Sequence, residues 1–132
     1  MIPKRIVVFN PSSQEAERLA WLARQSGPAS PETDAGAAMA AFAEGDVAVA
    51  VIDVAFVGST ALKAIVRPPA GVLLTGPDEE PLARAADDWP PGVDVDTAVT
   101  SPARPRAEAF LRALGRAVEH ARLKAEAVEL RR

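Results

Sequence analysis

The feature that most constrains this chain is an apolar run from Val47 to Ile52, which ends at Asp53. Apolar and polar side chains do not alternate along it, and this is typical of a strand buried on both faces in the middle of a parallel sheet. Parallel strands need helical crossovers, so the run predicts an α/β fold. Ligands collect at the carboxyl ends of such strands, which makes Asp53 the first candidate functional residue.

The rest of the chain supplies the other strands and helices of such a fold. We expect strands at residues 5–10, 28–33, 47–53, 71–75 and 93–100, and helices at 12–25, 37–43, 61–66, 82–86 and 106–132. Prolines at 28 and 31 make the second strand short and place it at an edge of the sheet. Five strand–helix units in succession predict a flavodoxin-like (CheY-like) five-stranded parallel sheet with helices on both faces.

Composition excludes several classes of function. The 132 residues include no cysteine and one histidine, and the net charge is -3, so cysteine metal sites, thiolate catalysis and general attraction to nucleic acid or membrane are disfavoured. No glycine-rich phosphate loop follows the first strand, which argues against a dinucleotide site. We expect a cytoplasmic protein without a cofactor, divided into an α/β core at 1–105 and a last helix at 106–132.

The last helix carries a heptad-like seam of apolar residues. Its members recur at spacings of three and four, which is typical of a coiled coil; they are Leu111, Leu114, Val118, Ala121, Ala125 and Val128. On this register Lys124 and Glu129 could pair between two parallel chains. We therefore expect the helix to extend as a coiled-coil connector, or stalk, of a homodimer.

Taken in order, these motifs resemble the receiver domains of two-component response regulators over nearly the whole chain to about residue 120. Asp53, at the end of the third strand, is similar to the phosphoacceptor aspartate of that family. Thr75 matches its switch hydroxyl, and Thr100-Ser101-Pro102 occupies the place of its lysine–proline turn. The resemblance implies a signalling module of bacterial phosphorelays or transcription regulation rather than an enzyme.

The chain departs from the receiver pattern at three positions. Phe9 and Asn10 stand where the family has the acid pair that holds magnesium, and Ser101 replaces its lysine. Phosphoryl transfer depends on positioning and on stabilisation of charge, and the pocket lacks most of the charged groups that do this. We therefore interpret the chain as a pseudo-receiver, with Phe9, Asn10, Thr75 and Ser101 forming a degenerate pocket around Asp53.

A weaker likeness links the chain to the N-terminal domain of ANTAR-type antitermination regulators. It rests on Asn10-Pro11, on Thr100-Ser101-Pro102 and on the long last helix. The resemblance implies a protein partner, dimerisation, and contact with nucleic acid only through a downstream module that this chain does not contain.

Candidate partner-binding residues are Trp89, Val99 and Arg104, on the face of the fourth helix and fifth strand where receivers commonly meet a kinase or another regulator. Trp is enriched at binding hot spots, but a loop Trp that folds back on its own domain is an equal alternative for Trp89. Trp21, off the apolar stripe of the first helix, is a further candidate for a partner face.

Three functional hypotheses remain open from the sequence. The first is a non-enzymatic pseudo-receiver that acts through protein contacts. The second is a weakly phosphorylatable receiver in which Asp53 and Mg²⁺ still work. The third is a small-ligand sensor, for a nucleotide, in a crevice between Asn10, Asp53, Thr75 and Ser101. For Thr75 the alternative to a switch role is a hydroxyl bonded to local backbone.

Overall fold

The computed structural model describes residues 5–34, 36, 40, 47–56, 62–63, 66, 70–100 and 107–130. Its strands are β1 (Arg5–Phe9), β2 (Ala29–Glu32), β3 (Val47–Asp53), β4 (Gly71–Gly76) and β5 (Val95–Val99); its helices are α1 (Ser13–Ala23), α4 (Glu79–Asp87) and α5 (Ala107–Leu130). The strands form one parallel sheet in the order β2-β1-β3-β4-β5. The predicted CheY-like fold is confirmed, while the helices expected at 37–43 and 61–66 lie largely outside the described residues.

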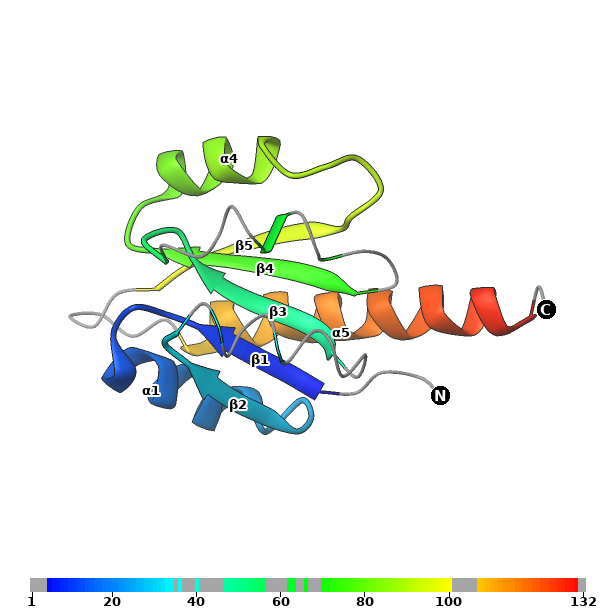
Figure 1. Ribbon diagram of the computed structural model, residues 1–132, viewed down its shortest axis with the longest axis horizontal. Coiled ribbons are helices and arrows are strands. Elements are labelled where there is room, and N and C mark those ends of the chain that lie inside the picture. Colours follow the sequence, from blue (N-terminus) through cyan, green and yellow to red (C-terminus); the bar gives the residue numbers. More distant parts are fainter. Residues whose placement is uncertain are drawn as a thin grey trace.

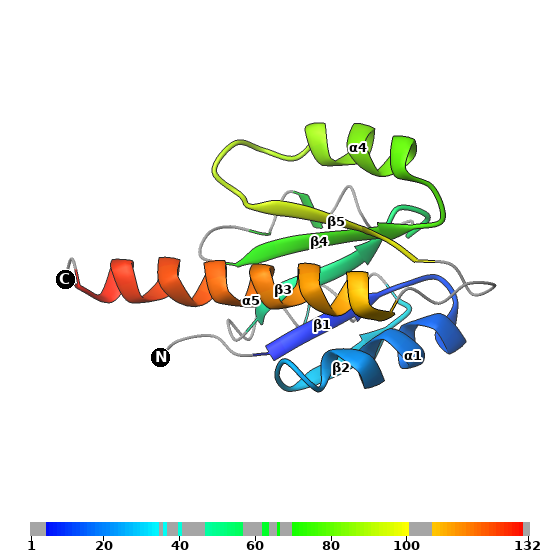
Figure 2. The ribbon, with the colours of Figure 1, turned by 180° about the vertical axis from the view of Figure 1, so that it is seen from behind.

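Helices lie on both faces of the sheet (Figures 1 and 2), and an apolar core lies on each face. On one face α1 and α5 cover Ile6, Val8 and Val49. On the other, Val7, Phe9 and Ile52 lie in a core that includes Leu82 of α4. Because neighbouring side chains of a strand point to opposite faces, β1 and β3 contribute to both cores. The run from Val47 to Ile52 is buried throughout, as expected for a central strand.

The loop between β1 and α1 is fixed by local hydrogen bonds. Asn10 Oδ1 accepts from the backbone N–H of Ser12 at 2.9 Å, and Ser12 Oγ accepts from the N–H of Glu15 at 3.3 Å. Ser12 is thus the N-cap of α1, as its spacing from Glu15 predicts. This places Asn10 at the carboxyl edge of the sheet, 5% exposed.

The heptad seam of α5 corresponds mainly to a stripe that packs on the chain's own sheet. Leu114, Ala121 and Ala125 are buried, and Leu111 and Val118 pack partly against the same core. The prediction that these residues form a stalk between two chains is therefore corrected along this length of the helix. Spacings of three and four fit a core-facing helix as well as a coiled coil, and here the sheet takes the stripe.

Beyond Ala125 the helix leaves the sheet, and its end projects past the strands (Figures 1 and 2). Val128 is 46% exposed and Leu130 is 87% exposed. Lys124 was expected to pair with a second chain. Its Nζ instead lies 3.0 Å from Asp94 Oδ2 and donates a hydrogen bond to the carbonyl oxygen of Gly92. In the described part of the chain, no helix has the length and apolar character that crossing a membrane requires.

Candidate functional site

Asp53 and Thr75 meet at the carboxyl edge of the sheet because they are register partners on β3 and β4. Thr75 is completely buried, and its Oγ1 donates to Asp53 Oδ2 at 3.4 Å. The other carboxylate oxygen, Oδ1, accepts from the N–H of Ala55 at 2.9 Å. The two residues of the predicted pocket thus lie side by side at the strand ends, and the hydroxyl of Thr75 bonds the carboxylate rather than loop backbone.

Burial dominates the electrostatics of Asp53. Loss of hydration raises the pKa of the carboxyl above its ordinary value, and the charge of Glu15 raises it further. The hydrogen bonds from Ala55 and Thr75 act in the opposite direction and partly offset this rise. The charged form of Asp53 is therefore held by two hydrogen bonds, while desolvation disfavours it.

Phe9 and Asn10, compared above with the acid pair of receivers, differ in what they do. Phe9 is fully buried in the core beneath α4, and its ring centroid lies 5.7 Å from that of Phe56. The side-chain carbonyl oxygen of Asn10 accepts from the N–H of Ser12. Phe9 is thus part of the core, and Asn10 is part of the start of α1.

The described residues supply few ligands for magnesium at this edge. Asp53 offers one carboxylate, whose oxygens accept hydrogen bonds from Ala55 and Thr75. The charge of Glu15 raises the pKa of Asp53. Both carboxylate oxygens of Glu15, however, accept hydrogen bonds from the guanidinium of Arg18, at 2.8 and 3.0 Å. Across the described ranges, no group of three or more His, Cys, Asp or Glu side chains could hold a metal ion.

Gly76 follows Thr75 at the end of β4, where there is no room for a side chain. A Cβ atom at this position would lie 2.9 Å from Cγ2 of Val54 and 3.4 Å from Cδ2 of Leu82. The N–H of Thr100 donates to the carbonyl of Gly76 at 2.8 Å, which ties the end of β5 to this point. Ser101, predicted to complete the pocket, lies outside the described residues, as does the candidate partner residue Arg104.

Of the two alternatives for Trp89, the structure has the one in which the side chain folds back on its own domain. Its side chain is 7% exposed and packs in the core beneath α4 with Leu82. Pro90 and Pro91 end the helical segment after Trp89. Burying the apolar surface of the indole in the domain's own core is favourable. Val99, by contrast, is half-buried at the end of β5, on the expected face.

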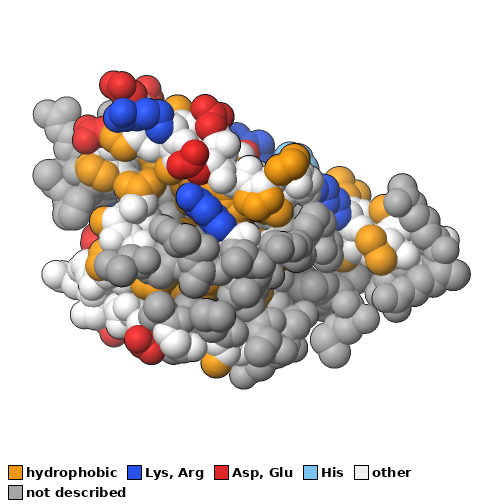
Figure 3. Space-filling view, turned by 45° about the horizontal axis from the view of Figure 1, so that its top comes forward, with side chains coloured by type: hydrophobic (Ala, Val, Ile, Leu, Met, Phe, Trp, Pro, Cys, Tyr) orange, Lys and Arg blue, Asp and Glu red, His pale blue; other side chains and the backbone are white. Residues whose placement is uncertain are grey.

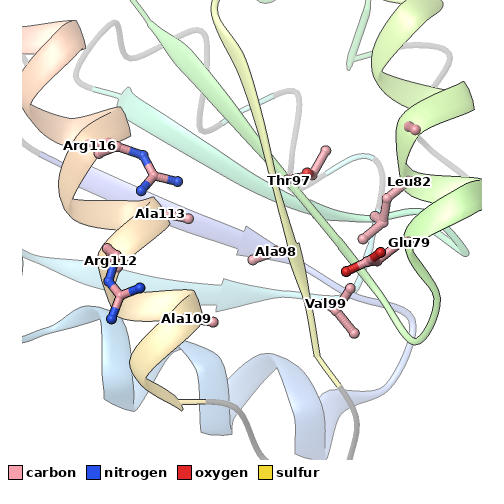
Figure 4. A pocket seen from close by; sticks show the side chains of 10 residues that line it. Glu79, Leu82, Thr97, Ala98, Val99, Ala109, Arg112, Ala113 and Arg116 are labelled. Carbon is pink, nitrogen blue, oxygen red and sulfur yellow. The ribbon is translucent and has the colours of Figure 1, made fainter.

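A hollow that the sequence did not predict lies beside β5 (Figure 4). Its volume is about 420 Å³, and α4, β5 and α5 form its walls. Arg112 and Arg116 project from α5 toward it, opposite Glu79 and Leu82 of α4. These residues come from segments far apart in the chain, so the one sequence signal was the four-residue spacing of the two arginines.

The surroundings of the hollow are strongly charged on the α4 side. Figure 3 shows acidic and basic side chains gathered over this helix, where Arg84 lies 3.9 Å from Glu80 in an exposed ion pair. A second surface hollow, beside α1 and β2, includes Trp21, Arg18 and Pro31. Trp21 is 65% exposed, so the prediction that it lies off the core stripe is confirmed.

Solved receiver domains share this fold. NtrX from Brucella abortus, in complex with ADP, matches with a TM-score of 0.78 and 21% identity over 98% of this chain. The signal receiver domain of an HD domain-containing protein from Pseudomonas fluorescens Pf-5 matches with a TM-score of 0.73 and 19% identity, covering 96% of this chain and 94% of that one. A putative pilus assembly-related protein from Burkholderia pseudomallei gives 0.61 and 21%, covering 89% and 90%.

The TM-scores and the strand order establish the fold, which is that of the CheY-like receivers of signal transduction. The chain spans 29% of the length of NtrX. No protein-family model and no curated protein matches the sequence.

Proposed function

We propose that this chain, whose fold is that of receiver domains, is a pseudo-receiver that acts through protein contacts rather than through phosphorylation of Asp53. The observation that carries the proposal is the use of the old acid-pair positions. Phe9 is fully buried in the core, and Asn10 Oδ1 accepts a hydrogen bond from the N–H of Ser12. Phosphoryl transfer depends on charged groups that position the phosphate, and the described residues that hydrogen-bond Asp53 offer one hydroxyl and one backbone N–H.

Exposure to acetyl phosphate and magnesium tests this proposal. We expect the intact mass to remain unchanged, and beryllofluoride to leave the backbone NMR spectrum unchanged. A receiver domain with a complete acid pair and lysine serves as the positive control for the reagents. A stoichiometric phosphoryl adduct that Asp53→Asn abolishes would overturn the proposal and support a weakly phosphorylatable receiver instead.

Self-association is a further part of the proposal, and it rests on the distal end of α5. Val128 and Leu130 are exposed where the helix passes the sheet, so a second copy could cover them there. Light scattering gives the mass in solution, and Leu130→Glu should shift any dimer toward the monomer. The coding sequence beyond Arg132 tests the ANTAR extension, because a three-helix RNA-binding module there would support it.

Nucleotide sensing is the second candidate function. Two NtrX structures, of which this chain matches 29%, were solved in complex with ADP and with ATP, which makes these two nucleotides the ones to test. Thermal unfolding with each nucleotide tests it, because a ligand that binds the folded state raises the unfolding temperature. An unchanged unfolding temperature at millimolar ADP and ATP would remove this candidate.

A further inference from the structure

The two edges of the sheet differ in how their backbone is protected. At the β2 edge, the carbonyls of Pro28 and Glu32 accept from β1, so the alternate residues Ala29 and Pro31 face outward. Pro31 has no N–H to offer, and the carbonyl of Ala29 accepts from Nε of Arg24 at 3.4 Å. Proline and covering side chains are how natural edge strands avoid pairing with other chains.

The β5 edge lacks this protection. The carbonyl of Asp94 and the N–H of Thr100 bond to β4, so Val95, Thr97 and Val99 direct their backbone groups outward. None of these residues is a proline, and no hydrogen bond reaches their outward groups from the described part of the chain. The hollow of about 420 Å³ lies along this edge and includes Thr97 and Val99 among its walls.

The charges beside this edge select its occupant. Arg112 and Arg116 are exposed on the α5 side, and neither forms an ion pair with a described residue. A second copy paired antiparallel through β5 would bring its own α5 alongside, and hence its two arginines toward these two. Like charges across an interface are unfavourable, so self-pairing is disfavoured and an acidic chain is favoured.

We infer that the β5 edge binds an extended acidic segment of a partner protein, which adds a sixth strand to the sheet. This deepens the proposed function, on which it rests, by naming the partner chemistry. Side chains of an added strand alternate between the two faces of the sheet. Acidic residues would face Arg112 and Arg116, and apolar residues would face Ala83 on the α4 side, where the carboxylate of Glu79 disfavours acidic ones.

A synthetic peptide of alternating Glu and Val, seven residues long and blocked at both ends, is the probe. We expect it to bind the full chain, with cross-peaks of Val95, Thr97 and Val99 among the most shifted in the NMR spectrum. A peptide with Lys in place of Glu should bind about tenfold more weakly or not at all. A Glu–Val peptide N-methylated on the amides that face β5 should lose binding, because it cannot form the ladder.

Matched variants of the protein separate charge from backbone. Arg112→Glu with Arg116→Glu should weaken peptide binding about tenfold, whereas Arg84→Glu, an exposed reversal on α4, should leave it unchanged. Thr97→Pro removes the central outward N–H of β5, as Pro31 does in β2, and should weaken binding too. Because this variant could disturb folding, the N-methylated peptide tests the same hydrogen bonds on the unaltered protein.

Three results would overturn the inference. They are equal binding of the Glu and Lys peptides, shifts confined to residues away from β5, and a light-scattering mass showing a dimer broken by Thr97→Pro but not by peptide. The last result would identify a second copy as the occupant. None of them bears on whether Asp53 is phosphorylated, so failure here is distinguishable from failure of the pseudo-receiver proposal.

Discussion

The pocket at the carboxyl ends of the strands and the hollow beside β5 are neighbouring regions with opposite character. In the pocket, Phe9 and Thr75 are fully buried, and the oxygens of Asp53 both accept hydrogen bonds. In the hollow, Arg112 and Arg116 are exposed and form no ion pair with the described residues. The strand-end site is therefore filled largely by its own side chains, whereas the hollow presents two cationic side chains that the described residues leave without an ion pair.

The largest test of this contrast is Phe9→Asp, which places an acid in the core at the end of β1. We expect it to lower the free energy of unfolding by about 3–5 kcal/mol, because it removes a buried aromatic ring and places a carboxyl in an apolar core. Urea denaturation followed by circular dichroism measures the loss. Phe9→Leu, which keeps most of the volume, is the control and should cost under about 1.5 kcal/mol. Equal stability of the Asp variant and wild type would mean that the pocket is not closed.

Adding carbon atoms to each region gives the next effect in size. Gly76→Ala places a methyl group 2.9 Å from Val54 Cγ2, and we expect it to cost about 1–3 kcal/mol. Ala83→Leu adds more atoms at the hollow, where the side chain is exposed, and should change stability by under about 0.5 kcal/mol. Thermal unfolding of both variants provides the comparison. A more harmful Ala83→Leu would reverse the assignment of closed and open regions.

The raised pKa of Asp53 predicts a dependence of stability on pH. Between the unfolded and folded pKa values the folded state binds more protons, so stability falls as pH rises from about 4 through the folded pKa. Asp53→Asn should remove this slope, and its stability relative to wild type should increase with pH over that window. Thr75→Val should raise the pKa of Asp53 further, because it removes a hydrogen bond to the charged form.

Carboxyl titration by NMR measures this pKa directly. A folded value below that of an unfolded aspartate would contradict the assignment of burial as the dominant influence. So would a wild-type stability that rises between pH 4 and 6 while Asp53→Asn stays flat.

The smallest effect concerns the exposed contact near the start of β5. Lys124→Ala removes the ion pair with Asp94 and the bond to the Gly92 carbonyl, and should cost about 0.5 kcal/mol. Amide exchange should increase in the last turns of α5, and added salt should weaken the wild-type contact. Arg122→Ala, which breaks pairs within α5 itself, is the matched control and should not affect amides around Asp94. Unchanged exchange in Lys124→Ala would show that this pair does not hold the helix.

Much of the fold could be predicted because its signals are local. The apolar run that ends at Asp53 requires burial on both faces, and the Ser12–Glu15 spacing gives the start of α1. The positions of Asp53 and Thr75 follow from two strand ends at one edge of a parallel sheet. The fold and the position of Asp53 at the edge of the sheet could therefore be predicted from patterns a few residues long.

The features that were missed depend on distant segments. The spacing in α5 fits a coiled coil and a core stripe equally, and the sheet decides between them. Trp89 is buried by the core beneath α4, and Lys124 meets Asp94 across the sheet end. The hollow is lined by residues of α4, β5 and α5, so the spacing of Arg112 and Arg116 alone could not predict it.

The buried stripe of α5 has a consequence for local stability. Ala113, Ala117, Ala121 and Ala125 recur every four residues and are all buried against the sheet. The bulky buried contacts of this helix with the sheet come from Phe110 and Leu114, in its first turns. Toward its end the contacts are alanines and the ion pair of Lys124 with Asp94, so less apolar area holds the last turns than the first. In amide exchange the end of α5 should therefore open before its beginning.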